Sequence, residues 1–379
     1  MKILITGGAG FIGSHTADAL IAQGHRVRIL DNLQPTVHPA GIPAYLNPQA
    51  EFQRGDVRDK GAWIEALKDV EAVYHLAAYQ DYLTDFSTFF HVNAVSTALL
   101  YEIIHTHGLH HQVKKVIVAA SQAVMGEGKY KCSACFEQQP VFHFPEIRLE
   151  AQLSAGQWDH LCPSCHQALQ WVPSDEKVVN PCNQYALSKH SQEQIAIQLG
   201  KRYGIPSVVM RYSIVQGPRQ SFYNAYSGAM RIFALALFLG RPPMIFEDGL
   251  QIRDFVNIQD VVAANLVVLA SDAANYEVFN VGGDRAWTVN DFYNTMQSVV
   301  GREIEPLVSG YYRYGDTRHI FSDTNKLQHL GWHATRNIQQ SIRDYWDYLN
   351  DQQALEDILE YAEKNMKKLQ VIRKVAPNR

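Results

Sequence analysis

The chain has 379 residues, of which 46% are hydrophobic and 19% are charged. This composition excludes a disordered or fibrous protein, and the length predicts two closely joined domains or one large α/β unit. The net charge of −4, from 34 basic and 38 acidic residues, provides no field that would attract a nucleic acid or an anionic membrane.

Neither a membrane span nor an export signal is predicted. The longest apolar runs, Ile232–Leu239 and Val261–Ala270, are shorter than the roughly 20 residues that cross a bilayer. Residues Met1–Thr6 lead directly into a glycine cluster, with no small-residue cleavage site after a long apolar stretch. We therefore expect a soluble, cytoplasmic protein.

Short apolar segments of the strand type alternate with segments of helical periodicity. The predicted strands are Lys2–Thr6, Arg26–Asp31, Glu51–Asp56, Ala72–Ala78, Lys115–Ser121, Ser207–Ser213 and Val278–Gly283. The predicted helices are Ser14–Gln23, Asp59–Leu67, Val92–His105 and Tyr185–Tyr203. This alternation predicts an α/β fold with a doubly wound parallel sheet.

Two segments interrupt this alternation. Residues 127–173 are rich in Cys, Gln, His and Pro and show no sheet periodicity, so we interpret them as an insertion. Residues 349–379 begin with an acidic helical pattern and end in several Lys and Arg residues. We expect a C-terminal helix followed by a solvated basic tail.

A glycine motif follows the first predicted strand. Gly7, Gly10 and Gly13 have the spacing G-x-x-G-x-x-G and stand between a strand and a helix. In this context the first glycine permits a tight turn, the second lets phosphates approach backbone N–H groups, and the third lets helix and strand pack closely. The motif predicts a dinucleotide site.

The second and later strands support this interpretation. Asp31 ends the second strand, where a carboxylate accepts hydrogen bonds from an adenosine ribose. It would repel a 2′-phosphate, and residues 32–35 contain no Arg or Lys to neutralise one, so NAD is favoured over NADP. Asp56 is expected near the adenine, and residues 76–78 along the cofactor.

A second motif supplies proton-transfer groups. Tyr185 and Lys189 are at positions i and i+4 of a predicted helix, so both project from one face. The pKa of a free tyrosine is near 10, and a nearby ammonium and a positively charged nicotinamide both favour the phenolate. Ser121, at the end of an apolar strand, offers a hydroxyl that can bridge a substrate oxygen and Tyr185.

With these motifs the chain resembles the extended short-chain dehydrogenase/reductase family, the NAD-dependent nucleotide-sugar epimerases and dehydratases of Rossmann fold. The resemblance covers about Met1–Trp346. Further matching segments are Gly217-Pro218-Arg219-Gln220, Arg253-Asp254-Phe255-Val256, Phe279-Asn280-Val281-Gly282-Gly283 and Gly315-Asp316-Thr317-Arg318.

The resemblance implies a tightly bound NAD and a set of site residues. The expected cofactor contacts are Gly7, Gly10, Phe11, Ile12, Gly13, Asp31, Asn32, Asp56, Val57, Leu76, Ala77, Ala78, Asn93, Tyr185, Lys189 and Ser213. The expected substrate contacts are Tyr79, Gln80, Ser121, Asn224, Arg253 and Arg318, of which the two arginines would bind the pyrophosphate of a nucleotide-sugar. The catalytic residues would be Ser121, Tyr185 and Lys189.

The residues after Ser121 narrow the reaction. Family members that eliminate water carry an Asp-Glu pair there, whereas this chain has Gln122 and Ala123, neither of which is a general acid or base. We therefore expect epimerisation at C4 through a transient 4-keto sugar, an isomerase reaction of class EC 5.1.3. Alternatives are reduction or oxidation of a nucleotide-sugar, a 4-epimerase of UDP-, GDP- or CDP-sugars, and a non-enzymatic NAD sensor or scaffold.

The insertion contains two C-x-x-C pairs. Cys132, Cys135, Cys162 and Cys165 have the spacing of a tetrahedral zinc ribbon. Four thiolates leave no open coordination position, so the predicted zinc is structural. Two disulfides are the alternative, and they need an oxidising compartment.

The insertion also makes the chain similar to a zinc-binding subgroup of the family, the dTDP-L-rhamnose 4-epimerases, so a dTDP-6-deoxyhexose is the expected substrate. We expect an NAD-binding domain (residues 1–211 and 253–283) that contains the insertion, and a nucleotide-sugar-binding domain (residues 212–252 and 284–348). The resemblance also implies a homodimer formed by the helices near Val92–His105 and Tyr185–Tyr203.

Overall fold

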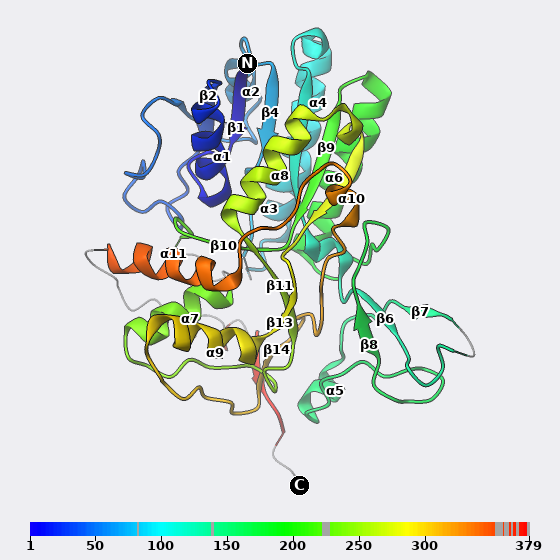
Figure 1. The fold of residues 1–379 in the computed structure, drawn as a ribbon. Coiled ribbons are helices and arrows are strands. Elements are labelled where there is room, and N and C mark those ends of the chain that lie inside the picture. Colours follow the sequence, from blue (N-terminus) through cyan, green and yellow to red (C-terminus); the bar gives the residue numbers. More distant parts are fainter. Residues whose placement is uncertain are drawn as a thin grey trace.

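The computed structural model describes residues 1–81, 83–137, 140–221, 228–352, 359, 364, 367–368 and 371–376 (Figure 1). Its centre is a parallel sheet of seven strands in the order β12-β9-β5-β4-β1-β2-β3. These strands are β1 (Lys2–Thr6), β2 (Arg26–Asp31), β3 (Glu51–Arg54), β4 (Ala72–His75), β5 (Lys115–Ser121), β9 (Ser207–Tyr212) and β12 (Glu277–Val281). The predicted doubly wound sheet is confirmed.

Helices cover both faces of this sheet (Figure 1). Side chains of β1 alternate: Ile3 and Ile5 are buried in one hydrophobic core, and Leu4 is buried in another. The first core includes α1 (Phe11–Ala22) and α8 (Ile258–Ala270), and the second includes α2 (Lys60–Ala66), α4 (Ser96–Thr106) and α6 (Gln184–Tyr203). Burial on both faces explains why these strands are almost wholly apolar.

The chain order creates a switch point beside β1. The chain runs from β1 outward to β2 and β3, and then returns to β4 on the other side of β1. The connections after β1 and β4 therefore diverge. In open α/β sheets, ligands bind in the crevice at this point, outside the carboxyl ends of the strands.

A second, smaller core lies below the carboxyl edge of the sheet (Figure 1). It contains residues of the sheet β10 (Ile214–Gln216), β11 (Ile252–Asn257) and β13 (Ala286–Thr288), together with α7 (Ala229–Phe238), α9 (Val289–Val300) and α11 (Ile338–Asn350). β11 therefore belongs to the second sheet, although the sequence assigns residues 253–283 to the first domain. α8 and β12, from the same stretch, do pack in the first.

The insertion forms its own small sheet. Its strands are β6 (Lys129–Lys131), β7 (Phe142–His143) and β8 (Gln170–Val172), in the order β7-β6-β8, and it also contains the short helix α5 (Glu150–Ser154). α3 (Phe86–Phe89) precedes a π-helical turn at Phe90–Val95, and α10 (Asn325–Gln328) precedes α11. Short 3₁₀ turns occur at Leu109–His111, Gln122–Met125 and Asp272–Ala274.

The C-terminal residues differ from the expected solvated tail. β15 (Ile372–Lys374) pairs antiparallel with β14 (Tyr311–Arg313), and Ile372 is buried. Most of the predicted C-terminal helix lies outside the described residues. Within the described part of the chain, we find no helix with the length and apolar character needed to cross a membrane.

Candidate active site

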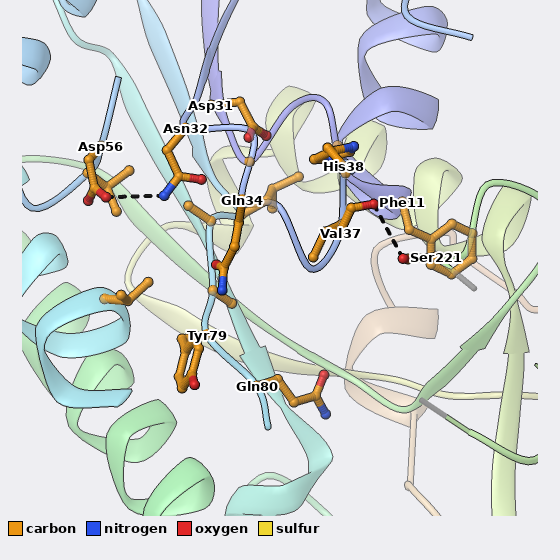
Figure 2. A pocket seen from close by; sticks show the side chains of 18 of the residues that line it. Phe11, Asp31, Asn32, Gln34, Val37, His38, Asp56, Tyr79, Gln80 and Ser221 are labelled. Carbon is orange, nitrogen blue, oxygen red and sulfur yellow. Dashed lines mark hydrogen bonds between the residues drawn. The ribbon is translucent and has the colours of Figure 1, made fainter. Parts of the chain in front are cut away.

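A cavity of about 660 Å³ lies at the switch point (Figure 2). Its walls include these predicted cofactor contacts: Gly7, Gly10, Phe11, Ile12, Gly13, Asp31, Asn32, Asp56, Val57, Leu76, Ala77 and Ala78. Two predicted substrate contacts, Tyr79 and Gln80, line it as well. The volume suits a cofactor-sized ligand.

The glycine turn is as tight as the motif predicts. Gly7 has φ +66°, and a Cβ there would lie 2.8 Å from Cα of Ala77. A Cβ on Gly13 would lie 2.3 Å from the carbonyl oxygen of Gly7. Glycine at both positions lets the N-terminus of α1 approach β1 and β4, where its backbone N–H groups can face a phosphate.

Two carboxylates occupy the far end of the cavity. Asp31 ends β2, and its carboxylate accepts hydrogen bonds from the backbone N–H groups of Ala9 (3.1 Å) and Leu33 (2.9 Å). Asp56 accepts hydrogen bonds from Asn32 and from the guanidinium of Arg58 (Figure 2 shows the former). Hydrogen bonding by Arg58 lowers the pKa of Asp56 to about 2.

Arg58 lines this part of the cavity and was not among the predicted contacts. Its position two residues after Asp56 was the only signal in the sequence. Its guanidinium forms a two-pronged pair with Asp56, with distances of 2.9 and 2.8 Å. Since Asp56 neutralises it, Arg58 offers little charge to a 2′-phosphate, which agrees with the preference for NAD.

Two loops that are distant in sequence meet across the cavity. Residues 34–38 follow β2, and residues 219–221 follow β10; Ser221 Oγ donates a hydrogen bond to the carbonyl oxygen of Val37 (3.4 Å; Figure 2). Arg219 pairs with Asp18 (2.7 Å) and lies 5.1 Å from the ring centroid of Tyr45. No local sequence pattern predicts this contact, because only the fold brings the two loops together.

Asn93 does not line the cavity but anchors one of its walls. It lies in the π-helical turn, a distortion often found at functional sites. Its Oδ1 accepts a hydrogen bond from the backbone N–H of Tyr79 (2.8 Å), and its Nδ2 donates to the Tyr79 carbonyl and to Ser188 Oγ (2.9 Å). Asn93 therefore holds the loop after β4.

The predicted catalytic residues lie on two elements that pack together, α6 and the end of β5. Asn183 caps α6 by accepting a hydrogen bond from the Ala186 N–H, and this fixes the turn that carries Tyr185. Tyr185 packs with Tyr79, which lines the cavity, and with Ala123. Ser121 ends β5, and its Oγ accepts a hydrogen bond from the Ala123 N–H (3.2 Å).

Lys189 is buried one helical turn after Tyr185. Its Nζ lies 6.0 Å from the Tyr185 ring centroid and donates hydrogen bonds to the Ala119 carbonyl (2.7 Å) and to Gln192 Oε1 (2.9 Å). Burial lowers the pKa of Lys189 to about 7. The lysine can therefore change its charge near neutral pH beside the tyrosine.

Comparison with known proteins decides the family. The sequence model of the NAD dependent epimerase/dehydratase family matches residues 3–141 and 161–282. The chain belongs to this family. The gap between the matched stretches, residues 142–160, lies within the insertion.

Relatives in this family resemble almost the whole chain. The chain is 33% identical over 350 residues to the dTDP-L-rhamnose 4-epimerase of Burkholderia thailandensis, which covers 90% of this chain and 93% of that protein. Its fold is similar to the crystal structure of UDP-glucose 4-epimerase from Thermotoga maritima with UDP-glucose (TM-score 0.74, 28% identity, 92% and 99% of the two chains). It is also similar to UDP-glucose 4-epimerase from Thermus thermophilus in complex with NAD (TM-score 0.71, 26% identity, 93% and 99%).

Two further predicted contacts of this epimerase/dehydratase chain, Ser213 and Asn224, follow β9 in the sequence. Ser213 Oγ donates a hydrogen bond to Asp254 Oδ2 (2.7 Å) and lies 2.8 Å from Ser322 Oγ, so it joins the two sheets and does not line the cavity. Asn224 lies outside the described residues.

The two predicted pyrophosphate arginines have different surroundings. Arg318 is buried and pairs with Asp159 (2.8 Å), Glu247 (3.1 Å) and Asp248 (2.7 Å). Burial by itself would lower its pKa, but the hydrogen bonds to Asp248 and Asp159 outweigh this effect and raise it. Arg253 has one carboxylate within ion-pair distance, Asp316 at 4.0 Å, among the described residues. Burial lowers the pKa of Arg253, so its positive charge is less fully compensated than that of Arg318.

The four cysteines of the C-x-x-C pairs converge at one end of the insertion. Their Sγ atoms all lie within 4.8 Å of one another, and those of Cys132 and Cys165 are 3.4 Å apart. Backbone N–H groups of Cys165 and Ser164 that face Cys162 lower the pKa of its thiol to about 6. This is the only cluster with metal-binding chemistry in the described residues.

Proposed function

We propose that this protein is an NAD-dependent nucleotide-sugar 4-epimerase whose substrate is a dTDP-6-deoxyhexose such as dTDP-L-rhamnose. The observation that carries the proposal is the packing of Tyr185, with Lys189 one turn behind it, against Tyr79 in the wall of the switch-point cavity. The 33% identity to a dTDP-L-rhamnose 4-epimerase over 90% of the chain supports the choice of sugar.

In the proposed reaction, Tyr185 accepts the proton of the substrate 4-hydroxyl. The buried ammonium of Lys189 stabilises the resulting phenolate, and Ser121 orients the substrate oxygen. Bound NAD would supply a reversible hydride acceptor for C4, so no net cofactor would be consumed. The keto sugar must present its other face before it is reduced again, and Tyr185 then returns the proton.

Residues after Ser121 favour epimerisation over dehydration. Gln122 and Ala123 lie in the short turn that Ser121 caps, and Gln122 is buried. An amide and a methyl group cannot donate and accept protons at neighbouring sugar carbons. A dehydratase would need such groups at this place.

Arg253 is the best candidate for the substrate diphosphate. The neighbouring Asp254 accepts hydrogen bonds from Ser213, which follows β9, and from the Gly283 N–H, which follows β12. Arg253 is therefore next to the carboxyl edge of the main sheet, the edge at which Ser121 ends β5 in register with Tyr212. Its incompletely compensated charge suits a bidentate diphosphate contact.

The test is incubation of the purified protein with dTDP-L-rhamnose, without added cofactor, while NMR follows the configuration at C4. Conversion to the C4 epimer on the copurified NAD is expected, and UDP-glucose serves as the comparison substrate. If UDP-glucose were converted and dTDP-L-rhamnose were not, the proposed substrate would be wrong and a UDP-sugar would take its place. Product formation only with stoichiometric NADH consumption would identify a reductase.

Tyr185→Phe supplies the matched control. It removes only the phenolic hydroxyl, so turnover should fall by about 10²- to 10⁴-fold while NAD remains bound. Full turnover in this variant would refute the assigned base. NAD binding without turnover of any nucleotide-sugar in the unmodified protein would favour a sensor or scaffold.

We also propose that Cys132, Cys135, Cys162 and Cys165 hold a structural zinc ion. A tetrahedral ion with Zn–S bonds of about 2.3 Å requires sulfurs about 3.8 Å apart, which fits a cluster within 4.8 Å. Elemental analysis of the reduced protein should find about one zinc per chain. A metal-free, fully folded protein would refute this assignment.

Finally, we propose a homodimer in which α4 and α6 of each chain form a four-helix bundle. These helices pack together in one chain, and three large apolar side chains on or beside them, Val95, Leu187 and Tyr203, are exposed. Light scattering after size exclusion should give the mass of two chains. The mass of a single chain at micromolar concentration would refute the dimer.

A further inference from the structure

Hydrogen bonds attach the base of the insertion to residues 319–323. At its carboxyl end, the Ser174 N–H donates a hydrogen bond to the Phe321 carbonyl, and the Asp323 N–H donates to the Ser174 carbonyl (both 2.9 Å). Its amino end is joined to this same anchor, because the Lys129 N–H donates to Ser174 Oγ (3.1 Å). The insertion is therefore docked through backbone hydrogen bonds at its base, which argues against a freely moving lid.

Tyr130 extends from the cysteine cluster to this same segment. Its ring is fully buried in a core with Cys132, Cys162 and Leu169. Its hydroxyl donates to the His319 carbonyl (3.3 Å) and accepts from the His319 N–H (3.2 Å). One side chain thus connects the four-cysteine centre to both backbone groups of one residue.

The segment that Tyr130 holds also holds Arg253. The Arg253 guanidinium donates to the carbonyl of Arg318 (3.1 Å), the residue before His319, and to the carbonyl of Ile252 (2.9 Å). The Ile252 N–H donates to His319 Nδ1 (3.1 Å). Residues 318 and 319 therefore hold Arg253 at two places, its guanidinium and the backbone of the preceding residue, Ile252.

The insertion adds a second contact to this segment. Asp159, three residues before Cys162, accepts a hydrogen bond from Arg318 Nε (2.8 Å) and lies 3.5 Å from His319 Nε2. Its side chain is 44% exposed, so it can be replaced without opening the core. Both contacts come from residues that are close in sequence to the cysteines.

We propose that Tyr130 is a positioning residue for substrate binding: with Asp159, it couples the four-cysteine centre to residues 318–319 and so aligns Arg253 for an anionic diphosphate. This inference rests on the proposed function in one respect, the diphosphate as ligand of Arg253. In this role the insertion stabilises the position of Arg253 in the substrate site. Loss of the contacts between the insertion and residues 318–319 should therefore lower the affinity for the nucleotide-sugar. It should not affect the retention of NAD, because other residues line the NAD cavity.

The test compares Tyr130→Phe with the unmodified holoenzyme. The variant keeps the ring in the cysteine core and loses only the hydroxyl. We expect the Kd for dTDP, measured by calorimetry, and the KM for the sugar substrate to rise about five- to tenfold, with kcat changed less than twofold. NAD content and metal content should stay equal, and amide hydrogen exchange should accelerate in residues 316–322.

Tyr101→Phe is the matched control. Tyr101 is similarly buried, and its hydroxyl lies 2.6 Å from Ser207 Oγ at the amino end of β9, whereas the insertion follows the carboxyl end of β5. It should lower stability without changing the Kd for dTDP. Asp159→Asn, a substitution at a half-exposed position, should weaken dTDP binding in the same direction as Tyr130→Phe.

Unchanged dTDP affinity in both Tyr130→Phe and Asp159→Asn would overturn the proposal. An equal loss in Tyr101→Phe would also overturn it, since the effect would then be general destabilisation. If the unmodified protein bound no nucleoside diphosphate, the proposed function and the role of Arg253 would both fall. In that event the exchange rates of residues 316–322 would still report whether Tyr130 holds the segment.

Discussion

Replacement of Lys189 by Met tests the burial of the proposed catalytic lysine through the pH dependence of stability. Lys189 is 1% exposed, and its Nζ is hydrogen-bonded to one carbonyl and one amide oxygen. Burial lowers its pKa from 10.5 to about 7 in the folded protein. Between these two pH values the unfolded chain binds a proton at this lysine and the folded chain does not.

The sign follows from this difference. Where the unfolded state binds more protons, the free energy of unfolding rises with pH, by up to about 1.4 kcal/mol per pH unit for one group. Lys189 therefore destabilises the folded protein fully below pH 7, and this cost diminishes as the pH rises towards 10.5. Over the three units from pH 6.5 to 9.5, the unmodified protein should gain about 2–4 kcal/mol relative to Lys189→Met.

Urea unfolding of both proteins, freed of nucleotide, measures this gain at half-unit pH steps. The loss of two hydrogen bonds in the variant shifts the whole difference but not its slope, because neither acceptor titrates. Titrating groups that do not interact with Lys189 cancel in the difference. A difference that stays flat from pH 6.5 to 9.5 would refute the lowered pKa and with it the account of Lys189 as a group that titrates beside Tyr185.

Three further predictions concern the glycine turn, a loop of the cofactor cavity and a buried histidine of β4. Gly13→Ala should abolish NAD binding and destabilise the fold by about 2–4 kcal/mol, because its Cβ would lie 2.3 Å from the Gly7 carbonyl; Gly61→Ala, where the nearest atom is 3.3 Å away, should be nearly neutral in thermal unfolding. Arg219→Ala should speed NAD release about tenfold in a dilution assay, because the pair with Asp18 is lost; an unchanged rate would show that the loop does not retain the cofactor. Burial lowers the pKa of His75 to about 3, so its contribution to stability should be lost as the pH falls from about 6.5 towards 3. His75→Gln should remove this part of the acid sensitivity. If urea unfolding gave the same pH dependence of the unfolding free energy for both proteins, this prediction would be contradicted.

Local patterns in the sequence determined the fold class and the cofactor end of the site. The strand residues are buried on both faces, so they appear as continuous apolar runs, and every predicted strand and helix of the main sheet is present in the structure. The glycine motif and Asp31 are close in sequence to the strands that place them, and they line the same cavity. The i, i+4 spacing of Tyr185 and Lys189 likewise needs only a helix.

The tertiary structure decided which distant residues meet. Arg318 matches a family motif, yet the fold surrounds it with Asp159, Glu247 and Asp248, which come from two separate segments of the chain and satisfy its charge. Arg253 has one carboxylate, Asp316 at 4.0 Å, within ion-pair distance among the described residues. The hydrogen bonds between Val37 and Ser221 and between Tyr130 and His319 each join residues more than 180 positions apart. Such contacts depend on loop paths and strand order, which no local periodicity encodes, whereas turns, caps and buried strands are fixed by neighbouring residues.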